Sequence, residues 1–304
     1  FGSSKLGLSA KLSYNPRIRI KYTYSRSSLA NFNLAADYRN EHFRTMDANG
    51  EYINLHYNQF KGNAYISEFH LLNFSTNVGV WLAKTFYDFG TFEGSIYDSI
   101  YYVDNTVLAP YVNLEYDNLD DAYFAKHGIV SHLGSHFYYL PADKEKYFDL
   151  SYAFQAYITP RDGRFTVIPQ LYGRYVMSNT YFNLMNTCGG EIAGRHFENQ
   201  MPFIGLTCVE DGFLSNNVSV LRCDLRYNFY GKHYVTAMYN ASMPWGMLGT
   251  GVMTFAEWTD FIAQGAGLKY SYNSPLGPIS LTAHWSNVDF RNHFGAYFSF
   301  GYTF

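Results

Sequence analysis

The sequence predicts an all-β fold, a transmembrane antiparallel β-barrel of about sixteen strands. Three observations point to this class. Charged residues make up 15% of the 304 residues, whereas an ordinary soluble domain carries about 25%. Aromatic residues reach 20%, and a mean hydropathy of -0.22 is too polar for a bundle of membrane helices. A sheet with one apolar face and one polar face satisfies all of these values.

Alternation of apolar and polar residues is the main periodic signal. From 146 to 159 every second residue is apolar, and successive side chains of a strand point to opposite faces. An arginine on the lipid side of a barrel costs about 2–4 kcal/mol at the bilayer midplane, so the charged face must line the lumen. A soluble sandwich with the apolar face inside is the alternative. The residues expected to line the lumen include Glu115, Asp149, Arg222 and Arg226.

Segments of about ten residues repeat this pattern along the chain, which we treat as a single domain, 1–304. The segments 62–74 and 76–87 alternate less regularly, and Pro169 would remove a hydrogen-bond donor from its strand. The uncharged stretch 233–256 is long enough for a membrane helix, but Asn240 and Pro244 interrupt it, so we expect a strand there. The expected strands are 5–14, 17–26, 29–40, 51–60, 62–74, 76–87, 89–100, 105–118, 122–139, 146–159, 164–176, 217–230, 232–243, 260–273, 277–287 and 293–304.

Short and long connections separate these segments. Turn residues such as Asn15-Pro16 and Ser274-Pro275 mark tight hairpins. The two long connections are 177–216 and 244–259, and a forty-residue connection of this kind is usually functional. The chain opens with Phe1 and carries no secretion signal, which indicates a mature or truncated piece.

Several kinds of site are not expected. A formal net charge of -3 provides no basic field for nucleic acid. His132 and His136 share a strand face, but about 13 Å separates them, too far for one metal ion. No metal and no cofactor are therefore predicted. Cys188 and Cys208 lie in one connection, and both a disulfide and two free thiols remain open.

Two stretches carry a family resemblance. The connection contains CGGEIAGRHFENQMPFIG (188–205), and it precedes a strand that reads NNVSVLRCDLRY (216–227). This arrangement resembles the outer-membrane insertase and two-partner-secretion transporter superfamily, sixteen-stranded barrels whose sixth external loop folds into the lumen. The variant is most similar to the C-terminal barrel domain of bacterial patatin-like phospholipases. The segment NLDDAYFAKHGI (118–129) and the closing GPISLTAHWSN…HFGAYFSFGYTF also resemble that domain, and the likeness covers most of 105–304.

The resemblance implies two sets of functional residues. In the superfamily an arginine at the loop tip pairs with a carboxylate on the inner wall. Here the equivalent tip is Gly194-Arg195-His196-Phe197, a variant of the Arg-Gly-aromatic motif, and Asp224 faces the correct side to be the partner. Alternatively, Arg195 is an exposed loop residue without a fixed partner. The end of the chain, with Phe300, Tyr302 and Phe304, resembles the signal that the barrel-assembly machinery reads during insertion.

The chain carries no catalytic motif. A patatin-like hydrolase needs a nucleophilic serine in a GxSxG turn, and that pattern is absent here. Either a hydrolase domain precedes this piece or the barrel stands alone, so the sequence leaves enzyme activity open. We expect an outer-membrane location in a Gram-negative cell envelope. The expected partners are lipid, lipopolysaccharide, the barrel-assembly machinery and other envelope proteins.

Three functions follow for such a barrel. The first is a membrane anchor that holds, and translocates, a patatin-like hydrolase, with the loop plugging the lumen. The second is an insertase or secretion pore that acts through the seam between the first and last strands. The third is a passive diffusion porin whose selectivity comes from lumen charges.

Overall fold

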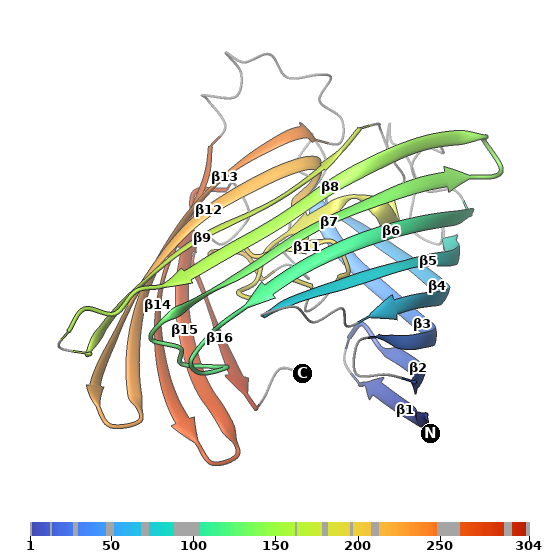
Figure 1. The fold of residues 1–304 in the computed structure, drawn as a ribbon. Coiled ribbons are helices and arrows are strands. Elements are labelled where there is room, and N and C mark those ends of the chain that lie inside the picture. The colour runs from blue at the N-terminus through green and yellow to red at the C-terminus, as the bar shows by residue number, and fades with distance from the viewer. Residues whose placement is uncertain are drawn as a thin grey trace. The chain divides into compact units, whose positions relative to one another are not determined.

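A computed structural model of the chain shows sixteen strands in one sheet among the described residues. Fourteen of them follow one another along the sheet from β1 to β16, and the short β10 and β11 lie off this path. Figure 1 shows this succession of long strands and hairpins. The structure describes residues 2–12, 14–26, 30–46, 52–67, 73–87, 104–161, 163–177, 182–194, 197–207, 213–247, 262–288 and 294–301.

Most of these strands contain at least the roughly nine residues that a strand needs to cross a membrane. Neighbours pair antiparallel, as in β12 with β13 and β14 with β15. In chain order the long strands are β1 (Ser3–Lys11), β2 (Arg17–Ser25), β3 (Asn31–Met46), β4 (Tyr52–Ser67), β5 (Phe74–Tyr87), β6 (Asn105–Asp117), β7 (Gly128–Leu140), β8 (Glu145–Tyr157), β9 (Phe165–Val176), β12 (Phe213–Tyr230), β13 (His233–Met247), β14 (Ala263–Ser274), β15 (Gly277–Ser286) and β16 (Phe294–Phe300).

The two faces of the sheet are inverted relative to a soluble protein. On β12, Leu221 is 64% exposed, whereas its neighbour Arg222 is 5% exposed. On β8, Phe148 is 43% exposed and Asp149 is fully buried. A soluble sandwich would bury Phe148 and expose Asp149, so that alternative does not describe this sheet. The apolar face looks outward and the charged face is covered.

Several expected boundaries need correction. The expected strand 51–60 and the first part of the expected strand 62–74 form one strand, β4, which ends at Ser67, because pairing continues through Gly62 to both Ala36 and Leu82. The expected strand 122–139 begins only at Gly128, because 118–127 forms a turn closed by its own aspartates. The expected strand 89–100 lies outside the described residues.

The uncharged stretch that begins at His233 is a strand, as expected, since β13 runs from His233–Met247. In the part of the chain that the structure describes, no helix is both long enough and apolar enough to cross a membrane. Within the described ranges, the helical element is one 3-10 turn, Phe182–Leu184.

The chain divides into two compact units. Unit 1 contains 1–116, 132–151 and 174–185, and unit 2 contains 117–131, 152–173 and 186–304. Whether the chain behaves as the single domain expected from the sequence stays a prediction.

Unit 1 contains a buried ion pair between Arg174 and Asp149. The Arg174 Nε donates to Asp149 at 2.6 Å, and the Tyr138 hydroxyl donates to the same carboxylate at 2.8 Å. Tyr138 also belongs to a buried apolar cluster that includes Trp81 and Leu140. A charge buried in this way needs such partners, because an unpaired one would be costly.

Candidate functional site: the inner loop and its seat

The inner loop, residues 186–207, belongs to unit 2 and folds into a small structure of its own. Its strand β10 (Asn186–Cys188) pairs with β11 (Gln200–Met201) on one side and with β12 on the other. Two backbone hydrogen bonds close the loop, from Gly190 N to Leu206 O at 2.7 Å and from Phe203 N to Gly190 O at 2.9 Å. A loop that pairs its own backbone can be covered without leaving polar groups unsatisfied.

Apolar side chains fix one end of the inner loop. Phe203, Leu206 and Met201 are buried with Val218 and Val220 of β12 in one cluster. Burying such side chains stabilises the folded position by roughly 1.5–3 kcal/mol each relative to exposure. The loop therefore rests on the covered face of the sheet.

The side chain of Asn240 on β13 binds the backbone of the loop at Ile204. The Ile204 amide donates to the Asn240 side-chain oxygen at 2.6 Å, and the Asn240 amide donates back to the Ile204 carbonyl at 3.4 Å. Gly265 of β14 makes room for this contact, because a Cβ there would lie 1.7 Å from the Ile204 carbonyl oxygen. Gly205 has φ of +110° and approaches the Trp285 backbone in the same way. The contact at Ile204 thus recognises main chain rather than a side chain.

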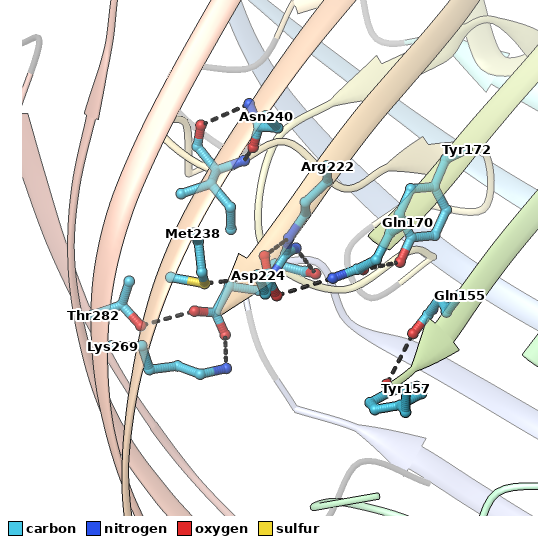
Figure 2. Close-up of polar contacts among 12 residues, drawn as sticks. Gln155, Tyr157, Gln170, Tyr172, Arg222, Asp224, Met238, Asn240, Lys269 and Thr282 are labelled. Carbon is cyan, nitrogen blue, oxygen red and sulfur yellow. Dashed lines mark hydrogen bonds and ion pairs between the residues drawn. The ribbon is translucent and has the colours of Figure 1, made fainter. Parts of the chain in front are cut away.

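A second contact joins the loop to an ion pair on β12. Arg222 donates twice to Asp224, from Nε at 2.8 Å and from a terminal nitrogen at 2.7 Å. Its other terminal nitrogen donates to the Glu191 carbonyl of the loop at 3.0 Å. The Gln170 amide also donates to Asp224, at 2.9 Å, and Tyr172 donates to Gln170. Figure 2 shows these side chains converging on Asp224.

The Glu191 side chain makes the third contact. Its carboxylate lies 3.2 Å from the Lys269 Nζ and accepts a hydrogen bond from the Thr282 hydroxyl at 2.8 Å. Burial opposes ionisation, but the positive charge of Lys269 and the hydrogen bond from Thr282 together hold the pKa of the Glu191 carboxyl below its ordinary value. Glu191 therefore binds β14 and β15 as a carboxylate. We call Arg222, Asn240, Gly265, Lys269 and Thr282 the loop seat.

The expected lock residues lie partly within this region. Gly194 has φ of +66° and donates its amide to the Gln200 carbonyl, and Phe197 is buried. Arg195 lies outside the described residues. Asp224, its expected partner, already accepts hydrogen bonds from Arg222 and Gln170. The pairing of Arg195 with Asp224 stays a prediction.

The residues expected to line the lumen have different surroundings. In unit 1, Asp149 is buried against Arg174, whereas Glu115 is half exposed and lies 3.7 Å from the His132 ring. In unit 2, Arg222 and Arg226 are buried on the face that holds the loop. At the chain end Phe300 is exposed on the apolar face.

Tyr302, Phe304 and Cys208 lie outside the described residues. The side chain of Cys188 is buried within the inner loop. Its pairing with Cys208 therefore stays open. Within the described ranges, no group of histidine, cysteine and acidic side chains is arranged to hold a metal ion.

Sequence reasoning did not single out most of the seat. Asn240 was noted only as a residue that interrupts an apolar stretch, although a buried amide needs hydrogen-bond partners. Glu191 lies in the quoted loop motif, four residues before Arg195. Lys269 shares strand parity with Ser271, which would have placed it on the covered face. No local pattern indicated that these residues meet.

A family model described as the OMP85 superfamily matches residues 21–304. Among solved structures the chain is similar to BamA from Haemophilus ducreyi lacking POTRA domains 1-3, with a TM-score of 0.72 and 13% identity, covering 97% of this chain and 64% of that one. It is also similar to CdiB from Acinetobacter baumannii, with a TM-score of 0.61 and 10% identity over 98% and 53%. CdiB from Escherichia coli gives 0.56 and 14% over 93% and 52%.

The chain spans 52–64% of the length of these three structures. None of the curated proteins matches it. At such low identity the solved structures show the fold, and they confirm the predicted barrel class. The match to residues 21–304 shows that the chain belongs to the OMP85 superfamily, as an outer-membrane β-barrel of Gram-negative bacteria.

Proposed function

We propose that this barrel handles polypeptides, assembling them into the outer membrane or exporting them across it, and that the inner loop closes it at rest. The observation that carries the proposal is the threefold attachment of the loop to its seat, through Asn240, Arg222 and Glu191. Apart from the apolar cluster around Phe203 and the pairing of β10 with β12, these three contacts are polar, and displacing this part of the loop breaks a small number of hydrogen bonds. A loop held in this way is suited to release when a client binds.

The loop seat also weighs against a passive porin. A selective open pore presents unpaired charges along its wall. Here Arg222 is paired with Asp224, and Lys269 is paired with the Glu191 of the loop. These charges bind each other and the loop, and so are not available to attract passing ions.

The anchor role remains a second proposal. It is supported by the resemblance of 118–129 and of the closing strands to the barrel domain of patatin-like phospholipases. It requires a hydrolase domain that this chain does not contain. A sealed barrel would serve an anchor as well, so the two proposals differ in what the barrel does to other polypeptides. Lipid, lipopolysaccharide and the barrel-assembly machinery are proposed partners in both.

Conductance in planar bilayers tests the closed state. We expect small, flickering currents from the intact barrel, because the loop covers the inner face of β12 to β15. Replacing 189–203 with a glycine-serine linker of equal length should give larger and steadier currents. Replacing the turn 158–164 in the same manner is the control, and it should leave the current small. A large steady current from the intact barrel would favour the porin.

A folding assay separates assembly from anchoring. The purified barrel is placed in lipid vesicles, and the folding rate of an unfolded eight-stranded outer-membrane barrel is measured. Assembly activity predicts faster client folding than in vesicles that contain an unrelated porin. Equal rates, together with a closed barrel, would favour the anchor or an export role.

A further inference from the structure

Unit 2 contains a cavity of about 510 Å³ that adjoins the loop seat. It is bordered by residues 191–193 of the inner loop, by residues 122–124 of the turn before β7, and by covered-face side chains of unit 2. A volume of this size is typical of sites for small ligands.

The charges that line the cavity do not balance. Three cationic side chains, Arg222, Arg226 and Lys269, face two carboxylates, Asp224 and Glu191. Arg222 is paired with Asp224, and Lys269 with Glu191. Arg226 forms no ion pair among the described residues, although the carboxylates of Asp121 and Asp224 lie close enough to attract its charge. Of the three cations that line the cavity, Arg226 is therefore the one whose guanidinium has no carboxylate in direct contact.

The surroundings of Arg226 satisfy its guanidinium only in part. The residue is 6% exposed, and one terminal nitrogen donates to the Ala125 carbonyl. The rings of Phe124, Tyr157 and Tyr234 lie within 6 Å of the guanidinium carbon. The Nε is buried and has no hydrogen-bond partner in the described part of the chain. A buried charge is normally paired, and aromatic faces replace only part of an anion's attraction.

We propose that Arg226 binds the oxyanion of a small ligand, a carboxylate or a phosphate, inside this cavity. A guanidinium with unused donors suits such groups, because its planar fork matches two oxygens of one anion. Gln155, Thr236 and Ser271 also line the cavity and supply neutral hydrogen-bonding groups. The Tyr157 ring provides an aromatic wall for the rest of the ligand. The site goes beyond the proposed handling of polypeptides and does not depend on it.

Calorimetric titration of the purified barrel in lipid nanodiscs tests the proposal. Sodium phosphate, acetate and benzoate are titrated separately at constant ionic strength. We expect saturable binding of at least one of them with one site per barrel, weakened at least about tenfold in Arg226→Gln. Arg226→Lys should retain part of the affinity. The exposed turn residue Arg164 provides the control, and Arg164→Gln should bind as the intact barrel does.

The three anions distinguish the ligand chemistry. Binding of phosphate alone assigns a phosphate site, and benzoate binding tighter than acetate assigns a carboxylate beside the aromatic wall. If Arg226→Gln does not fold, the intact barrel and Arg226→Lys decide the outcome. Absence of saturable binding of all three anions to the intact barrel would overturn the proposal. Equal binding by folded Arg226→Gln would do the same.

Discussion

The side chain of Asn240 binds the backbone of the loop in the way that a neighbouring strand would, with one hydrogen bond in each direction. It lies fully buried on β13, and its amide group both accepts from and donates to the backbone of Ile204. In Asn240→Ala the Ile204 amide would lose its acceptor, and an unsatisfied buried group costs about 1–3 kcal/mol. We expect faster hydrogen exchange in 197–207, measured by mass spectrometry. Asn228, a half-buried residue near the end of β12 whose side chain donates to the Gly231 carbonyl, is the control, and Asn228→Ala should leave exchange in the loop unchanged.

For Arg195 the sequence and the family resemblance predict an ion pair with Asp224. If its guanidinium joins Asp224 on the inner wall, removing it loosens the loop tip, because breaking a buried pair costs about 3–5 kcal/mol. The Asp224 carboxylate can accept a further hydrogen bond from Arg195, because it has more lone pairs than Arg222 and Gln170 use. We expect Arg195→Ala to raise protease cleavage within 190–200 in folded barrels. Unchanged cleavage, with Arg164→Ala as the reference, would mean that Arg195 has no fixed partner.

The inner loop should respond to acid. The Glu191 pKa is lowered when the loop is seated, so this carboxylate stabilises the seated state fully above its ordinary pKa near 4.5. That contribution is lost as the pH falls through the lowered value. We expect the frequency of current fluctuations to rise below about pH 4.5, measured in planar bilayers. In Glu191→Gln this pH response should be absent, whereas Glu145→Gln, at an exposed strand end, should keep it.

Strand β12 allows the inverted faces to be tested within one element. Leu225 is 52% exposed on the apolar face, midway between charged neighbours that are covered. Leu225→Arg should lower the free energy of unfolding by about 2–4 kcal/mol if the side chain faces lipid near the midplane. Tyr230→Arg, at the end of the strand, is the matched control, since an arginine near the membrane interface costs about 0–1 kcal/mol. Guanidinium titration in vesicles measures both, and equal losses would contradict the arrangement.

For the molecule as a whole, the fold class followed from composition and alternation because a membrane imposes both. The lipid requires an apolar outer face, and this leaves a period of two in nearly every strand. The expected division between 51–60 and 62–74 was wrong, because the strand continues through Gly62, and a glycine occurs both in turns and within strands. The expected boundary of β7 was wrong because Asp120 and Asp121 close a turn that alternation cannot detect.

The seat was beyond prediction because it depends on tertiary proximity. Glu191 and Thr282 are separated by 91 positions, and Ile204 and Asn240 by 36. Periodicity assigns each residue to a face of the sheet but does not indicate which loop will rest there. The resemblance supplied the loop and its tip, and parity supplied Asp224 as a candidate partner. The contacts through main chain, which leave no trace in side-chain chemistry, required coordinates.

Recognition through main chain has an evolutionary consequence. Asn240 and Gly265 touch the peptide group of residue 204, which is the same whatever side chain stands there. The side chain at position 204 can therefore vary among relatives, whereas a side chain added at position 265 would collide with the loop. In an alignment of relatives we expect Gly265 and Asn240 to be more strongly conserved than Ile204, whose backbone they contact.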